Sequence, residues 1–186
     1  MITATRKEQI EKTVRKVNDF SEKYQLSHAI FAIEKMYKEK VYAECQERFA
    51  LVREETKMVD SDDDDAIVAL NEKVAQIKKD SLSRIRIIIE YSDSFNIHSS
   101  RVTRSQDDVF TIHLPKCMEN IRNAAGEIDD NLLTTCRKLV AHELGHIVLH
   151  EGLFGQAQED MEEEADCFAE CLLALRRIQH DEILLH

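Results

Sequence analysis

Two histidines and a glutamate in the C-terminal part of the chain have the residue types and spacing of a catalytic metal site. Residues 141–146 read AHELGH and contain an HExxH motif. Residues four apart on an α-helix are separated by about 40° around its axis, so His142 and His146 can bind one ion. Zinc accepts two imidazoles in this way. Glu143 points to an adjacent flank, where it can take a proton from zinc-bound water.

A zinc ion with two histidine ligands needs a third protein ligand, and the acidic sequence EEEAD at residues 162–166 offers one. Glu162 and Asp166 are four residues apart and share one helical face. If Glu162 is the ligand, as a resemblance given below implies, Asp166 can orient a ligating histidine through its second ring nitrogen. Glu163 and Glu164 remain alternatives for the third ligand. A solvated acidic helix start is the alternative for the whole cluster.

Two other ligand sets can be compared with the sequence. A metzincin would require glycine at position 149 and histidine at position 152, where the chain has Leu149 and Gly152. His150 lies one turn beyond His146 but is rotated by about 80° from His142. We therefore interpret His150 as a cation near the C-terminal end of the helix, not as a ligand.

The sequences HELGHIVLH at 142–150 and EEEADCFA at 162–169 together resemble the ImmA/IrrE family of bacterial and phage metallopeptidases, which are similar to gluzincins. In gluzincins the third ligand is a glutamate on a second helix, followed four residues later by Asp or Asn. The resemblance implies a Zn²⁺ ion, a compact zincin-like α+β domain and cleavage of a partner regulatory protein, often a helix-turn-helix transcriptional repressor. It covers only the last third of the chain, and RKLVA at 137–141 departs from the family pattern.

The elements that would position these residues are two helices and a small sheet. The HExxH helix is predicted to begin at an N-cap, Asp129 or Asp130, and to end at Gly152, and a second helix begins near Glu159. Residues 84–91 (RIRIIIEY) and 109–114 (VFTIHL) are predicted strands, and 92–108 a hairpin-like connection. We expect a mostly helical α+β fold whose sheet packs against the HExxH helix, with an exposed edge that could bind an extended peptide. His113 and Tyr91 are unranked candidates for stabilising an oxyanion.

Residues 1–80 form a predicted N-terminal helical region that packs on the same domain as a metallopeptidase core at 81–186. Apolar residues recur at helical spacing over 5–24 and 28–56, and the second helix is long enough for an arm or hairpin. The acidic run at 61–65 favours a further helix start and lacks the glycine and spaced ligands of a calcium loop. This region resembles no part of the family and could be a docking arm, an oligomer interface or a regulatory cap.

Composition limits the partners. The 186 residues carry 25 Lys and Arg against 36 Asp and Glu, a net charge of −11, which disfavours nucleic acid and anionic membranes as partners. Five cysteines without a CxxC pair indicate buried free thiols in a reducing compartment. The sequence shows no signal peptide and no apolar run of about 20 residues, so a cytoplasmic protein is expected. The oligomeric state is not indicated.

The patterns together predict a zinc-dependent endopeptidase that acts on a protein or peptide. The alternative from another class is a catalytically inactive zincin-fold protein that binds or sequesters a regulator, which the long N-terminal helices favour. A helical protein without any metal would require both the HExxH motif and the acidic cluster to be coincidental.

Overall fold

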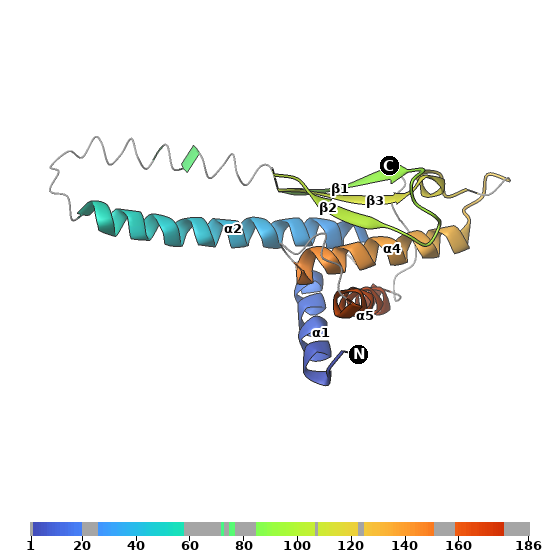
Figure 1. The fold of residues 1–186 in the computed structure, drawn as a ribbon, viewed down its shortest axis with the longest axis horizontal. Helices are drawn as coiled ribbons and strands as arrows, with labels where there is room; N and C mark the ends of the chain where they lie inside the picture. The colour runs from blue at the N-terminus through green and yellow to red at the C-terminus, as the bar shows by residue number, and fades with distance from the viewer. Residues whose placement is uncertain are drawn as a thin grey trace.

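A computed structural model of the chain describes residues 2–19, 26–57, 85–106, 108–122, 125–150 and 159–176, together with residues 72, 75 and 76. The elements in chain order are α1 (Ala4–Asp19), α2 (Leu26–Lys57), β1 (Arg86–Ser92), β2 (Arg101–Arg104), β3 (Val109–Pro115), a 3-10 helix (Lys116–Glu119), α4 (Asp130–Leu149) and α5 (Glu159–Arg176). The predicted α+β fold, mostly helical with a small sheet, is confirmed (Figure 1). The predicted helix start at 61–65 lies outside the described residues, as does Gly152.

The sheet has the strand order β1-β3-β2. Strands β1 and β3 agree within two residues with the two predicted strands, and they pair in parallel, with Ile87 opposite Phe110. The hairpin-like connection predicted for 92–108 is wrong, because this segment contains β2, which pairs antiparallel with β3. Strand β2 has only four residues (RVTR), of which Val102 alone is buried, so its sequence shows no alternation of apolar and polar residues.

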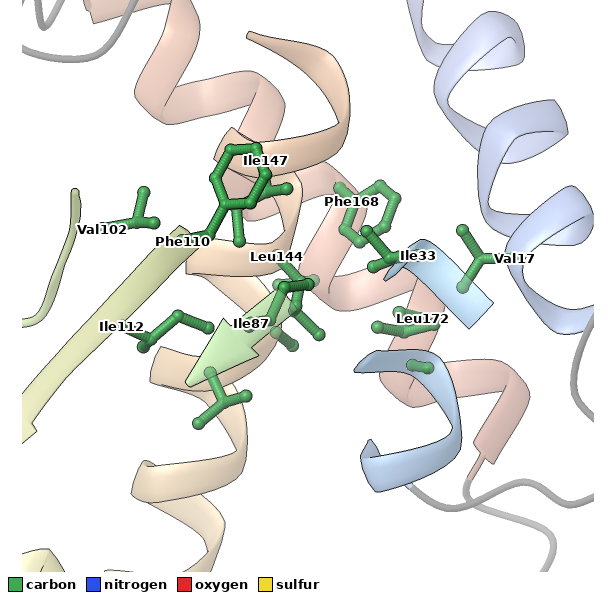
Figure 2. Close-up of a cluster of buried hydrophobic side chains, with 14 of the residues drawn as sticks. Val17, Ile33, Ile87, Val102, Phe110, Ile112, Leu144, Ile147, Phe168 and Leu172 are labelled. Atoms are coloured by element: carbon green, nitrogen blue, oxygen red, sulfur yellow. The ribbon is translucent and has the colours of Figure 1, made fainter. Parts of the chain in front are cut away.

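One face of the sheet packs against α4. Alternate residues of β3, Phe110, Ile112 and Leu114, are buried, as expected for a strand with one face on the core. They belong to one cluster with residues of α4, α5 and the two N-terminal helices, and Figure 2 shows Phe110 and Ile112 within it. The N-terminal helices contribute six of the fully buried positions, namely Ile10, Val14, Val17, Ala29, Ala32 and Ile33. Helices α1 and α2 therefore share one hydrophobic core with the sheet, α4 and α5.

Helix α4 is capped at both ends. The carboxylate of Asp129 accepts hydrogen bonds from the backbone N–H groups of Asn131 and Leu132, both at 3.1 Å, so the predicted N-cap is confirmed. The last carbonyls of a helix lack partners within it. Here the Tyr37 hydroxyl of α2 donates to the carbonyl of Ile147 at 2.6 Å. The end of the HExxH helix is thus fastened to α2.

Helix α2 is one continuous helix of 32 residues, about 48 Å long, which agrees with an arm and not with a hairpin. Its N-terminal half lies beside the sheet and α4, and its C-terminal half extends away from them (Figure 1). The Glu34 carboxylate of α2 accepts the backbone N–H of Ile87 at 2.6 Å and so holds the outer edge of β1. Within the described part, no helix is long and apolar enough to cross a membrane.

The cysteines only partly follow the prediction of buried thiols. Cys136 is buried in α4, whereas Cys117 is exposed in the 3-10 helix, so the prediction is wrong for Cys117. The reason is local, because the chain leaves the sheet after Pro115 and only Met118 of the following turn is buried.

Candidate metal centre

The candidate metal centre lies where α4 packs close to α5, and a glycine allows this approach. A Cβ atom on Gly145 would lie 3.0 Å from the Ala165 Cα atom and 3.1 Å from the Ala165 carbonyl oxygen. A larger residue would therefore separate the backbones of the two helices. Gly145 lies between His142 and His146, so the closest approach brings the acidic start of α5 alongside both histidines.

The two HExxH histidines and one glutamate converge on a common point. The Nε2 atoms of His142 and His146 are 3.0 Å apart, and the Glu162 carboxylate oxygens lie 3.2 and 3.5 Å from them. A tetrahedral zinc ion with ligands at about 2.0–2.1 Å separates its ligand atoms by about 3.3 Å. The distances are close to that separation, with a different Glu162 oxygen nearest to each histidine, and one ligand atom from each of the three residues lies within 4.8 Å of the others. These residues are the one His/Cys/Asp/Glu group of this kind in the described part of the chain.

The geometry distinguishes Glu162 from its two neighbours. Glu164 turns to the opposite flank of α5, where it bonds His150 and Arg6. Neither Glu164 nor Glu163 belongs to the convergent group found among the described residues. Asp166 lies one turn after Glu162 with its Oδ1 atom 2.8 Å from Nδ1 of His142. If this Nδ1 carries the proton, the Nε2 lone pair of His142 is left facing the convergence point.

Glu143 is 3% exposed and lies beside the ligand group, under the segment that enters β2. The Ser100 hydroxyl donates to its Oε1 atom at 2.6 Å. Burial raises the pKa of Glu143, while the Ser100 hydrogen bond, the charge of His142 and the Val102 backbone act in the opposite direction. A more basic carboxylate is a better proton acceptor, although a bound cation would lower this pKa again.

The second HExxH histidine, His146, lies between two other imidazoles. Burial lowers the pKa of His146, with a further contribution from the neighbouring His142. The neutral imidazole is the metal ligand, so a lowered pKa keeps His146 competent at neutral pH. On its other side, Nδ1 of His146 lies 3.0 Å from Nδ1 of His150.

His150 lies at the C-terminal end of α4, as predicted, and makes two contacts that the sequence did not indicate. It is the C-cap residue of α4, is 4% exposed, and joins His146 to Glu164 through its two ring nitrogens. The prediction of a cation near the helix end did not include these contacts. Arg6 of α1, which also binds Glu164, was missed entirely, since no pattern in the sequence relates residues 158 positions apart. The lowered pKa of Glu164 follows mainly from its hydrogen bond with Arg6.

A cavity of about 640 Å³ opens over the ligand group and extends along β2. Among the described residues, neither His113 nor Tyr91 lines it. His113 instead contacts Thr103 on the sheet. Residues that sequence reasoning did not single out line the wall, including Phe95, His98, Ser99 and Ser100. Two exposed basic residues also line it, and we call them the rim cations, Arg101 and Lys138.

Three comparisons with known proteins give no identity. The chain matches no known protein family, no curated protein and no solved structure. What the site does is therefore inferred from its own residues and distances.

Proposed function

We propose that the protein is a zinc-dependent endopeptidase of the ImmA/IrrE type that cleaves a partner regulatory protein. The observation that carries this proposal is the convergence of His142, His146 and Glu162, since one ligand atom from each residue lies within 4.8 Å of the other two. Two imidazoles and one carboxylate are the donor set of a catalytic zinc site that keeps a fourth position open. The cavity gives a substrate access to that position.

Each side chain has a distinct task in the proposed reaction. Zinc held by the three ligands would polarise a water molecule and the carbonyl group of the scissile peptide. Glu143 accepts a proton from the attacking water and then donates it to the nitrogen of the leaving amine. Ser100 keeps the Glu143 carboxylate in place through the 2.6 Å hydrogen bond. Asp166 keeps His142 oriented through its Nδ1 atom, at 2.8 Å.

An extended segment of a protein is the substrate that suits this cavity. Strand β2 is at the edge of the sheet, and residues 99–102 line the cavity. An edge strand can pair with an extended peptide through backbone hydrogen bonds, which would hold the peptide across the site. The net charge of −11 supports a protein partner over nucleic acid. A helix-turn-helix repressor is the partner that the resemblance of the two motifs implies.

The first test is the metal content of protein purified without chelator. We expect about one zinc ion per chain in the wild type, since the proposed site has one set of three ligands. We expect its loss in His146→Ala and in Glu162→Ala. Glu163→Ala is the matched control, because it removes a carboxylate from the same turn of α5 outside the ligand group. Zinc that stays in Glu162→Ala but leaves Glu163→Ala would refute the assigned ligand set.

A second experiment separates an enzyme from a sequestering protein. Glu143→Gln preserves the size of the side chain and removes the proton acceptor, so zinc binding should persist while cleavage of the partner stops. The projecting half of α2 favours the alternative, in which the protein binds a regulator without cleaving it (Figure 1). In that case wild type and Glu143→Gln would both release an intact partner after prolonged incubation.

A further inference from the structure

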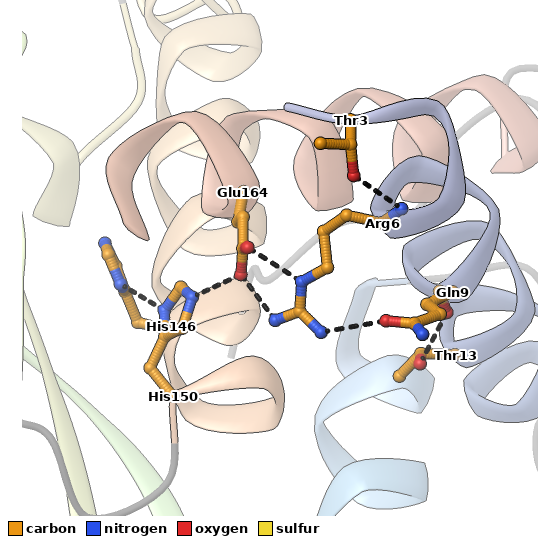
Figure 3. A network of polar contacts seen from close by, with 7 residues as sticks. All are labelled: Thr3, Arg6, Gln9, Thr13, His146, His150 and Glu164. Atoms are coloured by element: carbon orange, nitrogen blue, oxygen red, sulfur yellow. Dashed lines mark hydrogen bonds and ion pairs between the residues drawn. The ribbon is translucent and has the colours of Figure 1, made fainter. Parts of the chain in front are cut away.

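The N-terminal helix reaches the metal centre through four consecutive side chains (Figure 3). Arg6 of α1 donates from Nε to Glu164 Oε1 at 2.7 Å and from Nη2 to Glu164 Oε2 at 2.5 Å. Glu164 Oε2 lies 3.0 Å from Nε2 of His150, and Nδ1 of His150 lies 3.0 Å from Nδ1 of His146. We call this chain of contacts, Arg6–Glu164–His150–His146, the relay.

With neutral imidazoles, one arrangement of protons satisfies the three contacts of the relay, and the contact between the Nε2 atoms of His146 and His142 lies outside it. A carboxylate bound by an arginine fork accepts hydrogen bonds and donates none, so Nε2 of His150 must carry an N–H. In a neutral imidazole only one ring nitrogen carries a proton, and in His150 the contact with Glu164 assigns that proton to Nε2. Nδ1 of His150 is then an acceptor, and Nδ1 of His146 must donate to it. The lone pair of His146 is left on Nε2, which faces His142 and Glu162.

We propose that Arg6, Glu164 and His150 are positioning residues that hold His146 in the tautomer with a metal-binding Nε2, which makes α1 part of the metal centre. This inference rests on the proposed zinc site. The two ligating histidines are then oriented in different ways. His142 donates directly to the exposed carboxylate of Asp166, whereas His146, on the buried side, is oriented through a neutral histidine.

The relay is expected to affect metal binding more than folding. The Arg6 side chain is 36% exposed, and ion pairs at such positions add little to stability. Removing the partners that orient a ligating histidine lowers metal affinity by about 10- to 100-fold. A residue that only held α1 in place would show the opposite pattern, with a loss of folding stability and unchanged zinc affinity in the protein that remains folded.

The test compares zinc dissociation constants, measured by competition with a chromophoric chelator, in protein whose fold is checked by circular dichroism. His150→Phe retains a ring but no nitrogen, and its affinity should fall by about 10- to 100-fold. Glu164→Gln and Arg6→Gln should show smaller losses in that order, and Arg6→Lys should recover part of the loss. Arg15→Gln is the matched control, since it removes an exposed positive charge from the same helix and should leave the affinity unchanged.

A second readout needs neither zinc nor activity. In metal-free protein at about pH 8, where imidazoles are neutral, ¹⁵N chemical shifts report which ring nitrogen is protonated. We expect the proton of His146 on Nδ1 in the wild type and a mixture of tautomers in Arg6→Gln. A His146 protonated on Nε2 in the wild type would overturn the relay, as would wild-type zinc affinity in Glu164→Gln and Arg6→Gln. If the wild type bound no zinc, the proposed function would fail, and the tautomer would still decide for or against the relay.

Discussion

Replacing Gly145 by alanine tests whether the close approach of α4 and α5 builds the metal centre. The new Cβ would lie 3.0 Å from the Ala165 Cα atom, and backbone atoms cannot rotate away as a side chain does. Alanine stabilises a helix by about 1 kcal/mol relative to glycine, whereas forcing an extra carbon into a packed interface costs about 1–3 kcal/mol. The two effects nearly offset each other, so we expect a net destabilisation of about 0–2 kcal/mol. The helices should nevertheless move apart by a few tenths of an ångström.

This displacement carries Glu162 away from the two histidines, so zinc affinity should fall by about tenfold or more, as when a ligand loses its orientation. Urea unfolding of the metal-free protein and chelator competition measure the two quantities separately. Thr134→Ala, at an exposed position of α4, controls for helix propensity without touching α5. If Gly145→Ala stabilised the metal-free protein by the full propensity difference and bound zinc as tightly as the wild type, the close contact would not be what positions Glu162.

Three further outcomes are expected. Tyr37→Phe removes the donor to the Ile147 carbonyl, and we expect the free energy of unfolding in urea to fall by about 1 kcal/mol. An unchanged free energy of unfolding would mean that water replaces the hydroxyl. A short treatment with iodoacetamide should modify the exposed Cys117 well before the buried Cys136. Burial raises the pKa of the Cys136 thiol to about 11, and only the thiolate reacts. Equal labelling of the two cysteines by mass spectrometry would contradict this. Because of the rim cations, the zinc-loaded protein should bind an acidic peptide hydroxamate more tightly than a basic one of equal length. The reverse order of affinities in calorimetry would contradict a role of the rim cations in binding the peptide.

The elements of this fold that could be predicted from the sequence are those determined by local residue patterns, such as helix caps and apolar spacing. The position of α4 follows from the Asp129 cap and the apolar spacing, and the i,i+4 spacing places His142 beside His146. The same spacing indicated Glu162 with Asp166, but left Glu163 and Glu164 open. The choice among the three carboxylates depends on how α5 is rotated against α4, which is a property of the contact at Gly145 and Ala165 and is not encoded in either helix alone.

The parts that sequence reasoning missed depend on contacts between distant segments. Strand β2 is too short and too charged to show alternation, yet it brings Ser100 to Glu143, 43 positions later. Arg6 lies in an amphipathic pattern in which any charged residue would fit the exposed face. His150 follows the HExxH motif at helical spacing, and only its burial against Glu164 gives it a defined pair of partners.

The N-terminal helices contact the HExxH helix at its C-terminal end, where a helix is least constrained by its own hydrogen bonds. Tyr37 of α2 fastens the Ile147 carbonyl, and Arg6 of α1 reaches His150 through Glu164. Both contacts act on the turn that carries His146, while the hydrogen bonds to His142 and Glu143 come from α5 and from the entry to β2. Of the two histidines of the HExxH motif, His146 lies on the turn that these two N-terminal contacts reach, whereas His142 bonds Asp166 of α5.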